Sequence, residues 1–314
     1  MTSFDVLVIG ELNVDIILDD IQGFPVVGKE IVANELNVTL GSSSAIFASN
    51  LSSLGRSVAL AGLIGEDSFS DLIRTSLKSK GVNTDFVTNS KKYSTGLTIV
   101  MNYGMDRANV TFPGAMEHLL EKDITDEMLL GAKHMHLSSI FLQKGIRNEA
   151  VKLFKRAKKL GLTTSMDPQW DPDEIWNLKL EELLPHIDVW MPNIIEFEKI
   201  TGTDKVSTGI EKIKSFSNHI VIKDGTNGAH LWENGKLSSK PAFLNSEVAD
   251  CIGAGDSFDA GFISEFIKGS SMDRCVEVGN VMGAINTLAA GGTTAFENIE
   301  NIKKIANEKF EFIL

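Results

Sequence analysis

The chain has 314 residues, of which 43% are hydrophobic and 23% are charged, and its formal net charge is -12. These proportions are typical of a globular protein with an extensive core and exclude global disorder. The negative charge, which no Lys/Arg-rich stripe interrupts, excludes nucleic acid as an expected partner, although backbone amides and one cation can still bind a small anion locally.

Cysteines and apolar runs indicate the compartment. Cys251 and Cys275 are the two cysteines, and they lack the spacing of a metal site, so we expect reduced thiols. The first residues contain no basic stretch before an apolar run, so no signal peptide is predicted. Apolar runs such as residues 6–9 have strand length and cannot span a bilayer. The expected protein is soluble and cytoplasmic, with no membrane partner.

Strand-like runs alternate with helical patterns along most of the chain. In chain order the expected elements are a strand at 4–9, a helix at 43–54, a strand at 58–63, a helix at 68–79, a strand at 133–137, a helix at 147–160, and strands at 162–166, 189–191 and 219–222. This alternation predicts an α/β fold with a doubly wound, mostly parallel sheet flanked by helices, in a single domain spanning residues 1–314.

Two segments interrupt the α/β rhythm, from about residue 11 to 40 and from about residue 94 to 112. Both contain short alternating runs with Gly turns. Two interpretations remain open: the segments form a small sheet that serves as a lid, or they extend the main sheet in antiparallel fashion. Exposed lid strands would also allow two copies of the chain to pair edge to edge as a homodimer.

The most informative stretch is DCIGAGDSFDAGF, residues 250–262. Gly253 and Gly255 permit a tight turn, and helical spacing continues to Ile267. Unpaired amides at a helix start bind phosphate oxygens through hydrogen bonds and the helix dipole. Asp256 in that first turn can orient an acceptor hydroxyl and accept its proton. The alternative for Asp256 is a helix cap.

This stretch resembles the C-terminal signature of the ribokinase family, also called the PfkB carbohydrate kinases. The resemblance implies a ribokinase-like fold and transfer of the γ-phosphate of ATP to a hydroxyl of a small carbohydrate, with Mg²⁺ as cofactor. It also implies that Asp256 is the catalytic base and that the amides of Gly253, Ala254 and Gly255 form an anion hole.

The resemblance extends over almost the entire chain. GELNVD, residues 10–15, is similar to the family's junction between first strand and lid, which implies that Asn13 and Asp15 bind sugar hydroxyls. An Asx turn is the alternative. Gly41 and Ser42 open the family's second, sugar-side signature and are the further substrate-binding residues that it implies.

The phosphate and cation contacts also follow from the resemblance. PNIIE, residues 192–196, is similar to the family's Asn-x-x-Glu element, so Glu196 is expected to hold Mg²⁺ through water. The implied nucleotide-binding residues are Asn193, Lys223, Gly225, Thr226, Gly228 and Asn280. If the chain has the family's monovalent-cation loop, which would take K⁺, its residues are Asp250, Ile252, Asn286, Ala289 and Gly291.

Two departures from the family pattern concern the substrate. Ser42 replaces the second Gly of the sugar-side signature, and the usual substrate-binding Asn falls at Ile46, so one polar sugar contact is lost unless a serine replaces it. The segment after Asp167 offers Asp171 where some sugar-acid kinases have an Arg, which argues against an anionic sugar. Arg107 in the lid could supply that charge instead.

Other functions have less support. His134 and His136 share a strand face, but no third metal ligand is apparent, so strand packing is the preferred interpretation. No P-loop and no Gly-x-Gly-x-x-Gly after the first strand is present. A nucleoside kinase and a non-catalytic sugar-binding regulator on the same fold remain alternatives. The particular sugar and hydroxyl are not specified by the sequence.

Overall fold

The structure, a computed structural model, describes residues 3–103 and 106–314. Within these residues the larger of two sheets has the strand order β13-β12-β11-β10-β9-β8-β1-β4-β5. All neighbouring pairs are parallel except β11–β12 and β12–β13. The strands are β1 (Phe4–Ile9), β4 (Val58–Gly65), β5 (Val87–Ser90), β8 (Ala132–Ser138), β9 (Thr163–Asp167), β10 (Val189–Trp190), β11 (His219–Lys223), β12 (Ala229–Glu233) and β13 (Lys236–Lys240).

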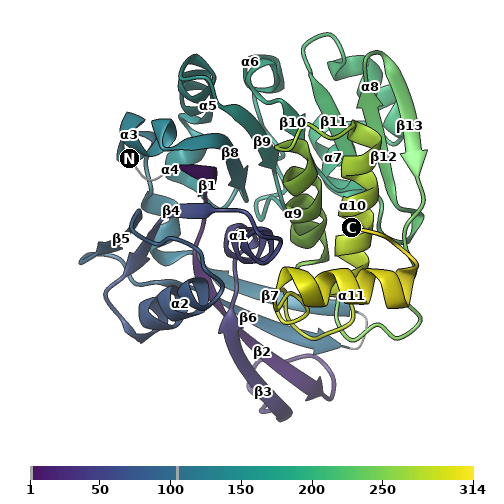
Figure 1. Ribbon diagram of the computed structural model, residues 1–314. Helices are drawn as coiled ribbons and strands as arrows, with labels where there is room; N and C mark the ends of the chain where they lie inside the picture. The colour runs from purple at the N-terminus through teal and green to yellow at the C-terminus, as the bar shows by residue number, and fades with distance from the viewer. Residues whose placement is uncertain (1–2, 104–105) are drawn as a thin grey trace.

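Helices cover both faces of this sheet (Figure 1). They are α1 (Ser43–Ser53), α2 (Ser68–Ser79), α3 (Asp126–Leu130), α4 (Lys144–Arg147), α5 (Ala150–Lys159), α6 (Leu180–Leu183), α7 (Ile194–Thr201), α8 (Val206–Ile213), α9 (Ala254–Phe266), α10 (Met272–Asn286) and α11 (Ile299–Phe310). Short 3₁₀ turns lie at η1 (Gly114–His118), η2 (Glu121–Asp123), η3 (Leu184–His186) and η4 (Gly225–Asn227). The predicted doubly wound α/β architecture is confirmed.

Strand β1 shows why the sheet is covered on two sides. Val6 and Val8 pack into the core that includes α1, α9 and α10, whereas Leu7 and Ile9 pack into the core that includes α5 and α7. Successive side chains of a strand point to opposite faces, so a continuous apolar run requires burial on both. Polar groups at the carboxyl ends of parallel strands meet at one edge, which is where ligands bind in such sheets.

The predicted helix at 147–160 is wrong in its first turn. Helix α4 ends at Arg147, and α5 begins at Ala150. Between them, Glu149 has φ -121° and ψ 13°, outside the helical region.

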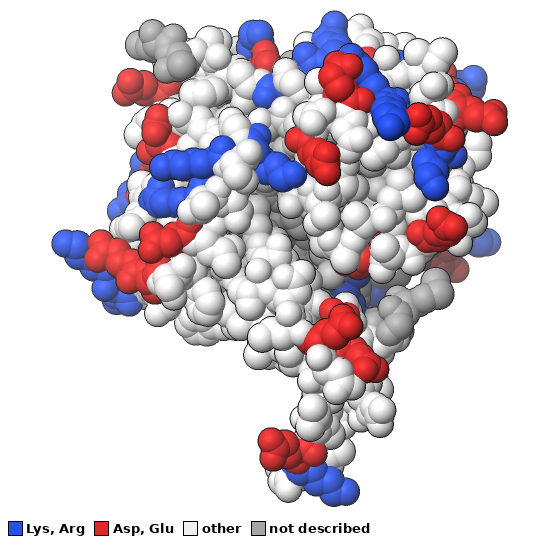
Figure 2. All heavy atoms as spheres, turned by 60° about the horizontal axis from the view of Figure 1, so that its bottom comes forward, with Lys and Arg blue, Asp and Glu red and all other residues white. Residues whose placement is uncertain are grey.

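The two segments that interrupt the α/β rhythm form a separate sheet, which we call the lid. Its strands are β2 (Asn13–Ile21), β3 (Ala33–Leu40), β6 (Gly96–Tyr103) and β7 (Asp106–Phe112), in the order β3-β2-β6-β7. The alternative of an antiparallel extension of the main sheet is therefore wrong. In Figure 2 the lid projects from the main body as a narrow arm, and much of its surface carries no charged side chain.

The two faces of the lid differ in polarity. Strand register aligns Thr39, Asp15, Thr98 and Thr111 in one row across the four strands. The adjacent row, which faces the opposite side, contains Val38, Ile16, Ile99 and Val110. Exposed apolar side chains of this second face include Leu36, Val38, Val110 and Phe112. The lid therefore has a polar inner face and an apolar outer face.

His134 and His136 form a buried polar ladder between β8 and β9. Ser165 Oγ lies 2.7 Å from Nε2 of His134 and 2.7 Å from Nδ1 of His136. The His136 ring stacks on Phe47 with 3.8 Å between centroids. Burial lowers the pKa of His134 to about 3 and that of His136 well below its usual value, so both rings are neutral. They pack the strands, as expected from their spacing.

Within residues 3–103 and 106–314, no helix has both the length and the apolar character needed to cross a membrane.

Candidate active site

The glycine turn before α9 is formed by close backbone contacts. Gly253 has φ +76°, and a Cβ atom there would lie 2.8 Å from Gly292 Cα and 3.0 Å from Ile46 Cγ2. Only glycine avoids both the strained conformation and the collision. Ile46 is buried against Gly253 and Gly292, so the residue at the family's usual Asn position packs behind the turn instead of offering a polar contact.

Asp256 lies in the first turn of α9 and is 8% exposed. Gln169 Nε2 donates a hydrogen bond of 3.0 Å to its Oδ1 atom. Burial, followed by repulsion from Asp167, raises the pKa of Asp256 to about 7.

A buried cation lies directly beside this turn. Lys223 Nζ is 2.7 Å from Asp167 Oδ2 and 3.0 Å from Asp259 Oδ2. A Cβ atom on Gly255 would lie 3.6 Å from the same Nζ atom. Burial disfavours the ammonium, but Asp167 and Asp259 outweigh that effect and raise the pKa of Lys223. The side chain of Lys223 thus has two carboxylate partners within the protein. Its contact with a nucleotide stays a prediction.

Asn193 and Glu196 begin α7 as a capping box. Glu196 N donates to Asn193 Oδ1 at 2.9 Å, while Asn193 N donates to Glu196 Oε2 at 2.9 Å. The end of β10 and the end of β11 are adjacent, which brings Asn193 beside Lys223. Burial and the charge of Asp167 raise the pKa of Glu196 to about 8. Asp167, Glu196 and Asp256 thus form a crowded acidic group whose repulsion a cation would relieve.

Two of the other predicted nucleotide-binding residues, Gly228 and Asn280, lie at the end of β13. Gly228 has φ +98°, and a Cβ atom there would lie 2.0 Å from Lys240 O. Asn280 Nδ2, on α10, donates to Pro241 O at 3.0 Å. Gly225 and Thr226 belong to η4, which connects β11 to β12. The structure therefore brings these residues into one neighbourhood, and their contact with a nucleotide remains a prediction.

The predicted sugar-binding residues meet at the base of the lid. Asn13 Nδ2 donates to Asp15 Oδ1 at 2.8 Å and to Thr98 Oγ1 at 3.0 Å. A Cβ atom on Gly41 would lie 2.2 Å from Asp15 Oδ1, so any larger residue at this position would displace the Asp15 carboxylate. Burial raises the pKa of Asp15 to about 6. Arg107 on β7 acts electrostatically on both Asp15 and Asp256, which places all three around one space.

The serines of the sugar-side signature bind a protein group. Ser42 Oγ donates to the Glu11 carbonyl at 2.6 Å, and Ser43 and Ser44 donate to the two carboxylate oxygens of Glu11 at 3.0 and 2.5 Å. Ser44 N also donates to Glu11 at 3.3 Å. Glu11 thus occupies the start of α1, where anions are stabilised. These bonds explain the serines without invoking a sugar contact.

The predicted monovalent-cation residues lie together where the loop before α9 meets the end of α10 and the loop that follows it. Asp250 accepts hydrogen bonds from Ile252 N at 2.9 Å and Gly291 N at 3.0 Å. Asn286 Nδ2 donates to Ile252 O at 2.7 Å, and Ala289 N donates to Asn286 O at 3.4 Å. Within residues 3–103 and 106–314, no cluster of three His, Cys, Asp or Glu side chains has the arrangement of a metal site, so K⁺ would depend on carbonyl oxygens.

Four residues of this site had no role in the sequence prediction: Glu11, Asp167, Gln169 and Asp259. Asp167 ends a parallel strand, and Asp259 follows Asp256 by three residues, which places both carboxylates on one helix face. These two signals could have been read from the sequence. The contacts of Glu11 and Gln169 could not, because they join segments 32 and 87 residues apart.

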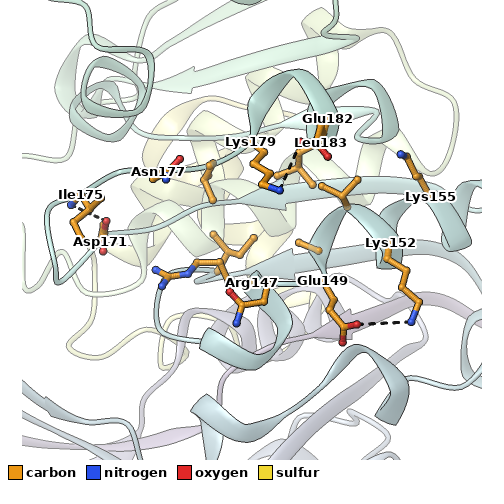
Figure 3. A pocket seen from close by; sticks show the side chains of 15 residues that line it. Arg147, Glu149, Lys152, Lys155, Asp171, Ile175, Asn177, Lys179, Glu182 and Leu183 are labelled. Carbon is orange, nitrogen blue, oxygen red and sulfur yellow. Dashed lines mark hydrogen bonds and ion pairs between the residues drawn. The ribbon is translucent and has the colours of Figure 1, made fainter.

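A second hollow lies away from these residues. It has a volume of about 790 Å³ and is bounded by α4, α5 and the segment 171–183. Figure 3 shows Arg147, Lys152 and Lys179 along it, together with Glu149 and Glu182. None of the predicted site residues lines it.

Comparisons with known proteins agree on one family. The family model described as pfkB family carbohydrate kinase matches residues 3–299. The chain is 25% identical over 314 residues to an ATP-dependent 6-phosphofructokinase of Thermoanaerobacterium thermosaccharolyticum, covering 98% of this chain and 95% of that protein. It is 24% identical over 310 residues to a ribokinase of Arabidopsis thaliana, covering 95% of this chain and 80% of that protein.

The fold agrees with these matches. The structure of a putative ribokinase II from E. coli in complex with ATP and Mg²⁺ superposes with a TM-score of 0.85 at 21% identity, covering 97% of this chain and 99% of that one. At this identity the likeness shows the fold, which is ribokinase-like.

Proposed function

The chain belongs to the pfkB family of carbohydrate kinases and is an ATP-dependent phosphotransferase with an alcohol group as acceptor, and we propose that Asp256 is the base of its reaction. The observation that carries this proposal is the position of Asp256 in the first turn of α9, buried directly after the Gly253 turn. An oxyanion of the transferred phosphoryl group is stabilised there by the amides of Gly253, Ala254 and Gly255.

The proposed step moves one proton and exchanges one bond. The acceptor hydroxyl oxygen forms a bond to the γ-phosphorus of ATP while the bond from that phosphorus to the leaving ADP oxygen breaks. The hydroxyl proton passes to Asp256 as the new bond forms. Gln169 donates a hydrogen bond to Oδ1 of Asp256, and we assign the acceptance of this proton to the other oxygen, Oδ2.

Mg²⁺ fits the acidic group around Glu196. This carboxylate supplies the hard oxygen donors that Mg²⁺ prefers, and Asp167 and Asp256 add negative charge nearby. Glu196 would hold the ion through water, and the ion would neutralise charge on the ATP phosphates. The loops at Asp250 and Asn286 are our candidate for K⁺ binding.

The acceptor is proposed to be a neutral carbohydrate. Asp15 accepts sugar hydroxyl protons at the base of the lid, where Asn13 and Gly41 fix its carboxylate. Glu11 acts electrostatically on both Asp15 and Asp256, so acidic groups predominate around the acceptor. These groups would repel an acidic or phosphorylated sugar, although Arg107 acts with opposite sign on both Asp15 and Asp256.

The decisive experiment measures ADP release with ATP and Mg²⁺ across pentoses, hexoses, sugar acids, sugar phosphates and nucleosides. Asp256→Asn is expected to abolish turnover of the compound that reacts. Asp273→Asn is the matched control, because Asp273 also lies in the first turn of a helix but is exposed. Turnover that survives in Asp256→Asn would overturn the assignment of the base. Turnover of nucleosides alone would replace the sugar assignment.

We also propose that two copies associate through the apolar outer face of the lid, which exposes Val38 and Val110. Light scattering at micromolar concentration is expected to give twice the monomer mass for the wild type and the monomer mass for Val110→Lys. Asn109→Lys, on the opposite face of the same strand, is expected to stay dimeric. A monomeric wild type would refute the proposal.

A further inference from the structure

We propose that Gln169 is a positioning residue for the reaction: its side-chain amide holds the Asp256 carboxylate in the orientation that leaves Oδ2 for the acceptor hydroxyl. This inference rests on the proposed role of Asp256 as base. It assigns a function to the segment after β9, where the chain departs from sugar-acid kinases.

The contacts of Gln169 define its orientation. Nε2 donates to Asp256 Oδ1 at 3.0 Å and to Asp167 Oδ2 at 2.6 Å, using both of its protons. Both partner atoms are carboxyl oxygens that accept these hydrogen bonds, so the amide presents its nitrogen to them. Within residues 3–103 and 106–314, no protein group donates a hydrogen bond to Asp256 Oδ2.

A hydrogen-bonded chain continues from Gln169 into the core. Asp167 Oδ2 accepts both the Gln169 amide and the Lys223 ammonium, the latter at 2.7 Å. Lys223 in turn is held by Asp259, three residues after Asp256 on α9. The base is therefore connected at both ends: through its helix to Asp259, and through Gln169 to Asp167. Fixing a carboxylate in this way lowers the reorganisation needed at the moment of reaction.

The backbone at Gln169 is strained, which supports a functional role. Gln169 has φ +59°, in the left-handed region that side chains other than Gly, Asn and Asp rarely adopt. Asn would fit that conformation better, but its side chain is one methylene shorter. The structure thus has the longer amide at a position where backbone preference favours the shorter one, and reach to Asp256 is the physical reason.

The segment after Gln169 is anchored so that this strain persists. Asp171 is buried, and its carboxylate accepts the amides of Asp173 at 3.1 Å, Ile175 at 3.0 Å and Trp176 at 2.6 Å. Figure 3 shows the bond from Ile175 to Asp171 at one end of the second hollow. Asp171 therefore fixes the loop that carries Gln169.

Gln169→Asn separates positioning from stability. It relieves the backbone and keeps an amide but loses the reach to Asp256, so kcat is expected to fall about tenfold or more while KM for ATP and Tm stay near wild type. The fall of kcat/KM at low pH, its acid limb, is expected to begin about one pH unit higher. The reason is that the Asp256 carboxylate loses the hydrogen bond from Gln169, which raises the pKa of Asp256. The charged groups that also act on the pKa of Asp256 are Asp167, Lys223, Glu11 and Arg107.

Gln143→Asn is the matched control. Gln143 is a buried amide that donates to Ser138 O at 2.6 Å, and this change is expected to lower Tm without moving the acid limb. Gln169→Leu, which removes both donors at similar volume, is expected to change kcat and the acid limb as Gln169→Asn does. If both Gln169 variants keep the wild-type kcat and acid limb while Asp256→Asn is inactive, the positioning role is wrong and the base assignment stands. If Asp256→Asn remains active, the proposed function itself fails.

Discussion

Lys223 Nζ lies 2.7 Å from Asp167 Oδ2, and both groups are buried at the carboxyl ends of β11 and β9, the two parallel strands on either side of β10. Asp259 adds a second carboxylate at 3.0 Å from the same ammonium. One positive charge is thus shared by two negative ones directly beside Gly255 and Asp256. The charge balance of the site depends on this lysine more than on any group that faces solvent.

Removing that lysine should destabilise the protein strongly. Lys223→Met leaves Asp167 and Asp259 buried without a cation, and breaking such a pair costs about 3–5 kcal/mol of unfolding free energy. Urea unfolding measures this loss. The double variant Lys223→Met with Asp259→Asn should recover part of it, since one unpaired charge is removed. Strictly additive single and double variants would show that the two groups are not coupled.

The pH dependence of the reaction should report the base. Burial and Asp167 raise the pKa of Asp256 to about 7. Only the carboxylate accepts a proton, so kcat/KM for the acceptor should fall about tenfold per pH unit below that value. Steady-state rates between pH 5 and pH 9 provide the profile. A flat profile down to pH 5 would show that Asp256 is not the group that titrates.

Replacing the base should stabilise the folded protein. The folded-state pKa of Asp256, about 7, lies above the usual 3.8, so folding is penalised at high pH and the penalty shrinks as pH falls from 7 toward 3.8. Asp256→Asn removes a penalty of about 4 kcal/mol at pH 8.5 and about 2 kcal/mol at pH 5.5. Urea unfolding at both pH values tests this. A variant less stable than wild type at pH 8.5 would contradict it.

The lid carboxylate should control acceptor affinity. Asp15→Asn removes a charged acceptor for sugar hydroxyls, so KM for the sugar should rise about tenfold or more while KM for ATP changes little. Asp19→Asn is the matched control on the same strand, four residues further from the main body. Equal effects of the two variants would mean that Asp15 does not contact the acceptor.

The histidine ladder should make acid destabilising. His134 has a folded-state pKa of about 3, below the usual 6.5. Between these two pH values the unfolded chain binds a proton at His134 that the folded chain does not bind, so the free energy of unfolding decreases as the pH is lowered. Lowering the pH from 7.5 to 5.0 should therefore cost the wild type about 2 kcal/mol more than His134→Gln. Carboxyl groups with raised pKa values, such as Asp256, contribute an opposite change in the free energy of unfolding. This contribution is the same in both proteins, so it cancels when the value of the variant is subtracted from that of the wild type. Parallel pH profiles of the two proteins would refute this account.

Local patterns in the sequence determined the fold class and the reactive turn. Continuous apolar runs such as residues 6–9 specify buried parallel strands, because they match both faces of a covered sheet. The glycines before Asp256 specify a tight turn that opens a helix, because Gly253 requires φ > 0. Both features depend on residues close in sequence, which is why they could be predicted.

Contacts between distant segments decided the rest. The lid required two segments about 50 residues apart to pair as a separate sheet, Ser44 turned out to bind Glu11, and Ile46 packs behind Gly253. Gln169 reaches Asp256 across 87 residues, and no local pattern indicates that contact. Sequence periodicity specifies which face of an element is buried, whereas the partner of a polar side chain depends on which loops the folded sheet brings to the same edge.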